Sequence, residues 1–280
     1  MLRASSPVRA LTLGDSQAAL AVCAQDPVAN VFVAARIMDG GLNGNRGAML
    51  GYDHDEGQGL MWTSANVVPV QCTPRMVNAF ADKVIRRRRW ASSVFGPADP
   101  VLHLWSVVER DWGTAREVRA NQPLLVMREL PSRLGVPVDP FVRPATLAEV
   151  DLVLPAAEAM FTEEIGYPPY RGSDRAYRLG LEHLIRTGRT LVRIEDGQVV
   201  FKADLGSVAL GVTQIQGVWV HPSRRGEGLA VPAMAAVVEH AMRHHAPTAS
   251  LYVNDFNLPA LATYRRVGFV QAGVFATVLL

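Results

Sequence analysis

A short basic, glycine-rich stretch, residues 217–230 (GVWVHPSRRGEGLA), has the residue types of an anion-binding site. An apolar strand is expected to end at His221, and a helix is expected to begin near Leu229. The first amides of a helix lack intrahelical partners, and the helix dipole adds partial positive charge there. Phosphate is a common ligand of such a helix start. Gly226 and Gly228 would let the backbone approach that ligand, because neither carries a Cβ atom.

Two better-known phosphate motifs do not fit this stretch. A P-loop needs Lys followed by Ser or Thr after its last glycine, and here Leu229-Ala230 follows. A dinucleotide-binding loop needs a third glycine and, about 20 residues later, an acidic residue. Val231 and His240 stand near those positions. From this stretch alone, a plain strand-to-helix turn with glycines for geometry remains the alternative.

A second informative stretch covers residues 251–269. It predicts a short strand over 251–254, a turn, and a helix over 258–266 with Pro259 in its first turn, where the missing N–H costs nothing. Together the two stretches resemble the GNAT N-acetyltransferase superfamily. The residues that look like its acetyl-CoA diphosphate loop are Arg225, Gly226, Glu227, Gly228, Leu229 and Ala230. The residues that look like its C-terminal signature are Asn257, Ala260, Tyr264, Gly268 and Phe269.

The resemblance covers about residues 140–280, and it rests on the two motifs occurring in order. One position departs from the family pattern. Where the first glycine of the loop is Gly226, the family prefers Gln or Arg three residues earlier, and this chain has Ser223. A shifted register, Arg225-x-x-Gly228-x-Ala230, does fit the pattern.

The resemblance implies how acetyl-CoA, the expected co-substrate, is held. The strand residues Val218, Trp219 and Val220 would pair with the pantetheine arm as an added strand does. Their amides would polarise the thioester carbonyl, a contribution of about 2.7–4 kcal/mol per donor. The amides of residues 225–230 would hold the diphosphate, and Asn257 would bond a pantetheine amide. Ala260 and Tyr264 complete the predicted coenzyme site, and no metal is expected in it.

Tyr264 is the strongest candidate for a catalytic residue. It follows Asn257 by seven residues, two helical turns, so both side chains share one helix face. A phenol near the sulfur can protonate the departing thiolate. Amphipathic packing is the alternative reading of an isolated tyrosine on a helix.

The general base is not identified by the motif. Many family members carry a glutamate on the strand before the loop, whereas this chain has Gln214 and Gln216, which cannot accept a proton. Glu163 and Glu164 precede a segment, residues 166–169, that lines the acceptor site in relatives. One of them could meet a cationic amine or act through water. Two alternatives stay open: a solvated acidic helix end, and proton loss directly to bulk water.

The composition fits a globular protein of two domains. The chain has 280 residues, 49% of them hydrophobic and 19% charged, and a formal charge of +2. That size exceeds one domain of about 100–150 residues. The near-neutral charge argues against binding to nucleic acid or a membrane surface. Cys23 and Cys72 are too few for a disulfide scaffold and are expected to be buried thiols.

Three other features carry less weight. The arginine run over residues 86–89 could touch nucleic acid, but it ends a predicted helix, where cations are favoured. His240 and His244 have metal-ligand spacing on a helix but lack the glutamate of an HExxH motif. Asp15 and Gln17 interrupt the apolar segment that an export signal needs, and no apolar run is long enough to cross a membrane. We therefore expect a cytoplasmic protein.

Several elements are predicted from local signals. They are a loop over 39–47, a turn over 53–57, a strand over 59–70, a helix from Pro74 capped by Thr73, a strand over 141–143, a helix from 173 capped by Ser173, a hairpin turn at Asp196-Gly197, and a strand over 209–220 with Gly211 and Gly217 as possible bulge sites.

The order of predicted elements repeats in the two halves of the chain. Each half combines a strand, two helices, further strands and a strand–helix–strand unit, and Pro-rich residues separate the halves. The first half enters its last helices through Gln71-Cys72 without glycine, so we expect it to have lost the phosphate loop. The predicted domains are a degenerate GNAT-like domain over 1–130, a linker over 131–140 and a catalytic domain over 141–280. The predicted fold class is α/β (α+β), with two GNAT-like domains, each a mixed, mostly antiparallel twisted sheet flanked by helices.

These inferences lead to an acetyl-CoA-dependent N-acetyltransferase. It would move an acetyl group to a primary amine of a small molecule or protein by direct attack in a ternary complex. The alternative function is a non-catalytic sensor that binds acetyl-CoA. Mycothiol synthases share a tandem layout, but no residue here points to their substrate. The sequence leaves the acceptor, the oligomeric state and the role of the first domain undetermined.

Overall fold

The computed structural model describes residues 7–42, 48–54 and 57–280. Contacts divide the chain into two compact units. The first unit contains residues up to Leu125, together with Tyr252–Phe256 and Gln271–Leu280, and the second contains Val126–Leu251 and Asn257–Val270. This division follows spatial packing, so the last strand of the chain belongs to the first unit.

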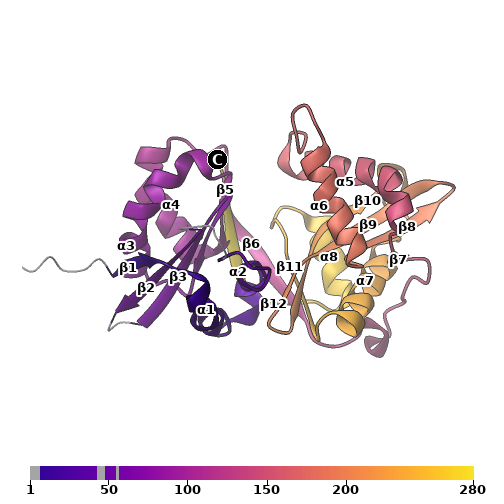
Figure 1. The fold of residues 1–280 in the computed structure, drawn as a ribbon. Coiled ribbons are helices and arrows are strands. Elements are labelled where there is room, and N and C mark those ends of the chain that lie inside the picture. The colour runs from indigo at the N-terminus through magenta and orange to yellow at the C-terminus, as the bar shows by residue number, and fades with distance from the viewer. Residues whose placement is uncertain (1–6, 43–47, 55–56) are drawn as a thin grey trace, which may run out of the picture. The chain divides into compact units, whose positions relative to one another are not determined.

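The first unit is a sheet with helices packed against it (Figure 1). Its strands follow the order β1-β2-β3-β4-β5-β12-β6, in which β4 and β5 run parallel and β1 to β4 form antiparallel pairs. The elements are β1 (Val8–Ala10), α1 (Ser16–Cys23), α2 (Pro27–Met38), β2 (Met49–His54), β3 (Gly57–Thr63), β4 (Asn66–Val70), α3 (Pro74–Val84), β5 (Ser93–Pro97), α4 (Ala98–Trp112), β6 (Glu117–Met127) and β12 (Val270–Leu279).

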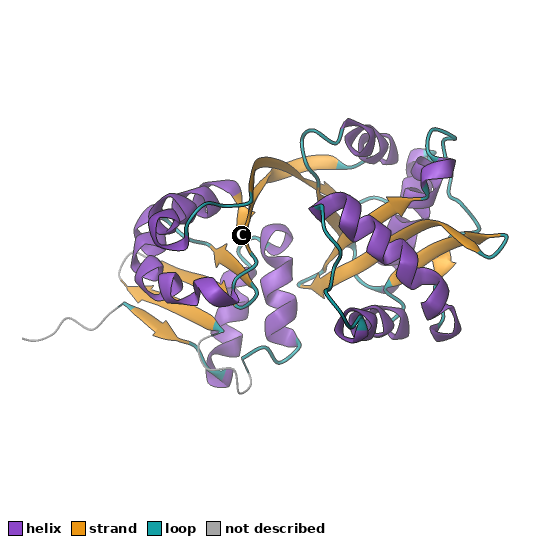
Figure 2. Cartoon of the chain, turned by 90° about the horizontal axis from the view of Figure 1, so that it is seen from above, coloured by secondary structure: helices purple, strands orange, loops and turns teal. Residues whose placement is uncertain are grey.

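The second unit repeats this arrangement with its own strands and helices. Its strands follow the order β11-β10-β9-β8-β7, and only β10 and β11 among these described strands run parallel. The elements are β7 (Arg143–Pro144), α5 (Val150–Ile165), α6 (Arg175–Arg186), β8 (Thr190–Glu195), β9 (Gln198–Ala209), β10 (Val212–Val220), α7 (Ala230–His244), β11 (Thr248–Tyr252) and α8 (Leu258–Val267). Helices flank the strands in both units (Figure 2).

Both units contain a strand–helix–parallel strand–helix segment, β4-α3-β5-α4 in the first and β10-α7-β11-α8 in the second. The predicted fold class, α/β (α+β) with mixed, mostly antiparallel strand pairing flanked by helices, is therefore confirmed. The first unit passes from β4 to α3 without glycine. There the Thr73 hydroxyl oxygen accepts a hydrogen bond from the Met76 amide at 3.4 Å, as its predicted role of N-cap requires.

Each unit has its own apolar core. In the first, the buried face of α3 (Met76, Val77, Phe80, Ala81, Val84) packs with α4 against the strands, in the helical period that its sequence predicts. In the second, α5 and α6 pack on β8 to β10 through a cluster that includes Val153, Ile185, Val192 and Trp219. This second core lies directly beneath the end of β10.

The predicted strand over 209–220 was wrong at its start. Leu210 and Gly211 have positive φ angles of 51° and 74°, so they form a hairpin turn, and β9 extends to Ala209. Gly211 is therefore a turn residue, although a bulge was predicted there. The second predicted bulge is confirmed: Gly217 has φ 60°, and the β9–β10 register shifts between Gln216 and Trp219.

The bounds of several other elements differ slightly from those predicted. The stretch 59–70 contains two strands, β3 and β4, separated by a turn. Asp174, and not the predicted Ser173, is the N-cap residue of α6, although the Ser173 hydroxyl accepts a hydrogen bond from the Arg175 amide at 3.2 Å. The predicted strand 141–143 is found only as β7, and β12 was not predicted. Parts of the predicted loop 39–47 and turn 53–57 lie outside the described residues.

Candidate functional site

The end of β10 separates from the neighbouring strand β11. Parallel pairing joins Val212–Gln214 only to Thr248–Ser250, whereas antiparallel pairing with β9 continues to Val220. Within the described residues of the second unit, the β11-facing edge of Val218, Trp219 and Val220 therefore has no partner on β11. An extended chain can add to such an edge through main-chain hydrogen bonds.

The loop after β10 presents amides without protein acceptors. The Arg225 amide donates to the Pro222 carbonyl oxygen at 3.4 Å, so it belongs to the loop itself. For the amides of residues 226–229, no acceptor is found among the described residues. The first intrahelical bond of α7 runs from the Ala233 amide to the Leu229 carbonyl oxygen at 3.2 Å, which leaves the amides of Ala230 and Val231 open as well.

The backbone conformation of the loop requires glycine at positions 226 and 228. Gly226 and Gly228 have φ angles of 84° and 80°, values that residues with a Cβ atom rarely adopt. A Cβ atom at either position would meet no atom within 4 Å, so the space above the loop is open. Leu229 is buried and anchors the loop where α7 begins. The loop thus combines unpaired amides, open space and a helix start.

The loop arginines are both paired with carboxylates. Arg224 bonds Glu195 and also Glu227, the latter at 2.7 Å. The Arg225 guanidinium donates to Glu163 of α5 at 2.7 Å and to the Val220 carbonyl oxygen at 3.0 Å. Glu163, a predicted candidate base, is therefore held by Arg225.

Tyr264 lies on α8, and Asn257 directly precedes this helix, as predicted. Asn257 is the N-cap: its Oδ1 accepts a hydrogen bond from the Ala260 amide at 3.2 Å, so only its amide nitrogen remains to donate to a ligand. Tyr264 is 7% exposed and lies edge-on to Phe269. Among the described residues, no hydrogen-bond partner is found for its hydroxyl.

Burial, and then the negative charge of Glu164, raise the pKa of Tyr264 well above its ordinary value. The phenol therefore keeps its proton at neutral pH. Glu164, the second candidate base, is exposed at the end of α5, and its negative charge contributes to the raised pKa of Tyr264. The two neighbouring glutamates of α5 thus have different surroundings, Glu163 facing an arginine and Glu164 influencing a phenol.

A buried ion pair that was not predicted from the sequence lies next to the bulge. Lys202 and Asp204 on β9 are 0% and 6% exposed and bond to each other, and the Thr190 hydroxyl donates to Asp204 at 2.8 Å. A Cβ atom at Gly217 would lie 3.1 Å from Asp204 Oδ2. Two charged residues spaced by two within an apolar strand were the signal that could have revealed the pair.

The two glutamines on β10 occupy different environments. Gln214 is buried, and Gln216 is exposed. A Cβ atom at Gly206 would lie 2.2 Å from the side-chain amide carbon of Gln216, so this glycine makes room for the glutamine amide. Neither side chain can replace the strand glutamate of many relatives as a base.

His240, His244 and His245 cluster at the end of α7. The ring centroid of His240 lies 4.6 Å from that of His244 and 5.5 Å from that of His245. Burial lowers the pKa of His240 and of His245. The charges of His244 and His245 add to this for His240, and that of Arg189 for His245. Among the described residues, no group of three or more His, Cys, Asp or Glu is arranged to hold a metal ion.

This cluster should make the protein less stable in mild acid. A histidine whose pKa is lowered by folding binds protons more readily when unfolded, so stability is lost as the pH falls below the ordinary value of about 6.5. We expect a lower thermal midpoint at pH 5.5 than at pH 7.5, measured by circular dichroism. The double variant His240→Gln/His245→Gln should show a smaller difference between the two pH values, and an unchanged difference would contradict this assignment.

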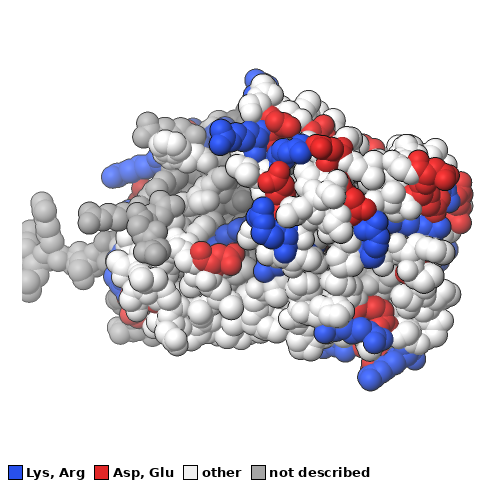
Figure 3. Space-filling model, turned by 45° about the vertical axis from the view of Figure 1, so that its right-hand side comes forward, with Lys and Arg blue, Asp and Glu red and all other residues white. Residues whose placement is uncertain are grey.

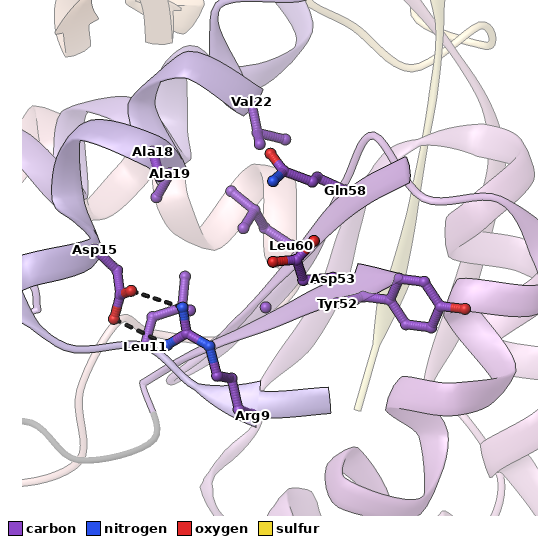
Figure 4. Close-up of a pocket in the computed structure, with 11 residues that line it drawn as sticks. Arg9, Leu11, Asp15, Ala18, Ala19, Val22, Tyr52, Asp53, Gln58 and Leu60 are labelled. Atoms are coloured by element: carbon purple, nitrogen blue, oxygen red, sulfur yellow. Dashed lines mark hydrogen bonds and ion pairs between the residues drawn. The ribbon is translucent and has the colours of Figure 1, made fainter. Parts of the chain in front are cut away.

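The first unit contains a small cavity between β1 to β3 and α1 (Figure 4). Its volume is about 70 Å³, and Arg9 at its rim bonds Asp15 at 2.7 Å. Small-molecule sites usually measure about 300–1,000 Å³, so this cavity does not fit a nucleotide. None of the predicted coenzyme-binding residues lines it.

Acidic and basic side chains are interspersed over the face shown in Figure 3, as the formal charge of +2 suggests. Among the helices that the structure describes, none combines the length and apolar character needed to cross a bilayer.

Comparisons with known proteins agree with this geometry. Residues 157–269 match the model of the acetyltransferase (GNAT) family, and residues 47–153 match a domain of unknown function, DUF4081. No curated protein matches the sequence.

Solved structures share the fold over nearly the whole chain. A GNAT-family acetyltransferase from Colwellia psychrerythraea is 12% identical, with a TM-score of 0.58 over 98% of this chain and 99% of that one. A GCN5-related N-acetyltransferase from Sphaerobacter thermophilus is 16% identical, with a TM-score of 0.59 over 96% and 94%. A tandem GNAT protein from the clavulanic acid biosynthesis pathway is 15% identical, with a TM-score of 0.54 over 97% and 98%. Over residues 157–269, the second half of this chain is similar to the acetyltransferase (GNAT) family.

Proposed function

We propose that the second unit is an acetyl-CoA-dependent N-acetyltransferase acting on a primary amine of a small molecule or protein. The observation that carries this proposal is the run of open amides over residues 226–231, at the start of α7 and beyond the free edge of β10. A diphosphate fits such a helix start, because the amides and the helix dipole both favour an anion. The GNAT family match supports acetyl-CoA as its carrier.

The coenzyme would lie along the site in a fixed order. The edge of Val218, Trp219 and Val220 would pair with the pantetheine arm, and the amide nitrogen of Asn257 would add a hydrogen bond near Ala260. Backbone amides of β10 would stabilise the oxyanion that forms on the thioester carbonyl. These roles suit an edge that β11 leaves free.

In the proposed reaction the neutral amine attacks the thioester carbon directly, within a ternary complex. A nitrogen–carbon bond forms, the carbon–sulfur bond breaks, and the thiolate takes the proton of the Tyr264 hydroxyl. The amine gives up one proton, for which Glu164, Glu163 or water is the proposed acceptor, and Tyr264 regains a proton from water before the next cycle. The products are an N-acetylated amine and CoA.

The first unit would not bind CoA in the same way. The junction between β4 and α3 lacks glycine, and the Thr73 side chain occupies the Met76 amide at that helix start. We propose that the first unit is non-catalytic. We also propose a cytoplasmic location for the whole chain.

The experiment that tests the function is ligand-induced stabilisation. A ligand of the native state at 100 times its Kd stabilises by about 2.7 kcal/mol, so acetyl-CoA should raise the thermal midpoint. S-acetyl-N-acetylcysteamine, a thioester without the diphosphate, is the matched control and should raise it far less. If acetyl-CoA leaves the midpoint unchanged, the proposal is wrong.

A screen of amines for CoA release separates an enzyme from a sensor. Release of thiol with one class of amine, measured by a colorimetric thiol assay, is the expected result. Stabilisation by acetyl-CoA without release for any amine would favour the non-catalytic sensor.

A further inference from the structure

The arginines of the anion loop differ in how firmly they are held. Arg224 contacts two carboxylates, and hydrogen bonds with Glu227 and then Glu195 raise its pKa. Arg225 pairs with one carboxylate, Glu163, and the two side chains are 47% and 46% exposed. An ion pair this exposed contributes little to stability, so Arg225 can change partner at small cost.

Glu163 is placed where a negative charge needs compensation. It lies in the last turn of α5, which contains no basic residue and ends at Gly166. The helix dipole disfavours an anion at this end. One carboxylate oxygen of Glu163 accepts from Trp219 Nε1 at 3.2 Å, and the other accepts from Arg225 at 2.7 Å. Arg225 is therefore the counter-ion of Glu163, and Trp219 fixes the orientation of the carboxylate.

The same guanidinium also occupies the end of the strand edge. Arg225 Nε donates to the carbonyl oxygen of Val220 at 3.0 Å. Arg225 thus links three parts of the second unit: the loop, the last residue of β10 and the end of α5. An anion bound by the open amides next to Arg225 would attract this guanidinium in competition with Glu163.

We propose that Arg225 is a positioning residue that acetyl-CoA draws away from Glu163, and that the released carboxylate then binds an acceptor arriving as a primary ammonium ion. This inference rests on the proposed function and adds the order in which the two substrates bind. The diphosphate binds first and takes the guanidinium as a second contact. Glu163, still oriented by the indole N–H of Trp219, is left without a counter-ion, and a cationic amine restores the balance of charge. The bound ammonium then gives one proton to water, and the neutral amine attacks the thioester.

The test is the affinity of the full-length chain for acetyl-CoA, measured by isothermal titration calorimetry. Glu163→Gln keeps the shape but removes the competing charge, so acetyl-CoA should bind about two- to fivefold tighter, the range set by an exposed ion pair. Glu129→Gln is the matched control, because Glu129 is 48% exposed and pairs with Arg133 rather than with an arginine of the loop. It should bind like the unaltered protein. In an Arg225→Met background, Glu163→Gln should no longer change the affinity.

Nuclear magnetic resonance can follow the movement of Arg225 away from Glu163 directly. The indole N–H resonance of Trp219, assigned with Trp219→Phe, should shift when acetyl-CoA is added to the unaltered protein and shift less in Glu163→Gln. If the unaltered protein binds acetyl-CoA and Glu163→Gln binds it equally well, the exchange is overturned and the proposed function stands. If the unaltered protein does not bind acetyl-CoA, both are overturned. Should Glu163→Gln not fold, Glu163→Ala, which also removes the competing charge, gives the same readout.

Discussion

Replacing Lys202 with methionine is expected to lower the free energy of unfolding by about 3–5 kcal/mol. Lys202 is fully buried and is the cation that pairs with Asp204, which is itself 6% exposed. Methionine fills a similar volume but carries no charge, so the substitution leaves a buried carboxylate whose remaining side-chain partner among the described residues is the Thr190 hydroxyl. Removing one member of a buried pair costs far more than the pair contributes, because the remaining charge is still out of water.

Urea denaturation of the full chain, followed by tryptophan fluorescence, measures this loss. The double variant Lys202→Met/Asp204→Leu should recover most of it, since no buried charge remains. Arg133→Met is the control for a lost ion pair at the surface: Arg133 and Glu129 lie 3.1 Å apart and are 71% and 48% exposed. Its effect should stay below about 1 kcal/mol. A loss for Lys202→Met as small as that of the control would show that the ion pair is not buried in solution.

The buried pair also supports the proposed coenzyme site. Gly217, the bulge residue, approaches it so closely that a Cβ atom there would lie 3.1 Å from Asp204 Oδ2 and 3.5 Å from Lys202 Nζ. The bulge in turn sets the direction of the next residues, Val218 to Val220, which form the free edge. A substitution in the pair should therefore weaken acetyl-CoA binding as well as stability.

Local signals in the sequence predicted most of the elements. Asp196 and Gly197 form the hairpin turn with φ angles of 48° and 72°, because their residue types tolerate such values. Thr73 caps α3 and Asn257 caps α8 through their own side chains. Such features depend on a few neighbouring residues, so a single sequence is sufficient to reveal them.

Features that depend on distant residues could not be predicted in the same way. The strand β12 pairs with β5, for example Leu279 with Ser93, and nothing in its local sequence specifies a partner so far along the chain. The turn at Leu210 was missed because a leucine with positive φ is exceptional. A propensity for turns is carried by residue type, whereas strand partners are selected by the packing of the whole unit.

The candidate site shows the same contrast between local features and features that depend on distant residues. The motif residues Gly226 and Gly228 have positive φ angles, which glycine tolerates, and Tyr264 lies on the helix that the sequence predicts. The pairing of Arg225 with Glu163 joins residues 62 positions apart, and side-chain pairs of this kind depend on the fold. The sequence therefore indicates which residues are available for chemistry, and the fold decides which of them are already engaged.

Replacing Tyr264 with phenylalanine is expected to lower turnover by roughly 10²-fold or more, the range of general acid catalysis. The phenol donates a proton in the proposed step, and burial followed by the charge of Glu164 raises its pKa, so it stays protonated at neutral pH. An ordinary phenol ionises near pH 10. Ionisation of Tyr264 should therefore cause a fall in turnover only above that pH.

The same substitution should leave acetyl-CoA binding and stability nearly unchanged, since no protein partner of the hydroxyl is found among the described residues. Turnover is measured as thiol release with the best amine of the screen, and binding by calorimetry. Tyr177→Phe is a matched control: its hydroxyl donates to the Ala157 carbonyl oxygen at 2.9 Å and has no role in the proposed chemistry. If Tyr264→Phe turns over as fast as this control, the proton reaches the thiolate from water, and Tyr264 serves only to pack α8.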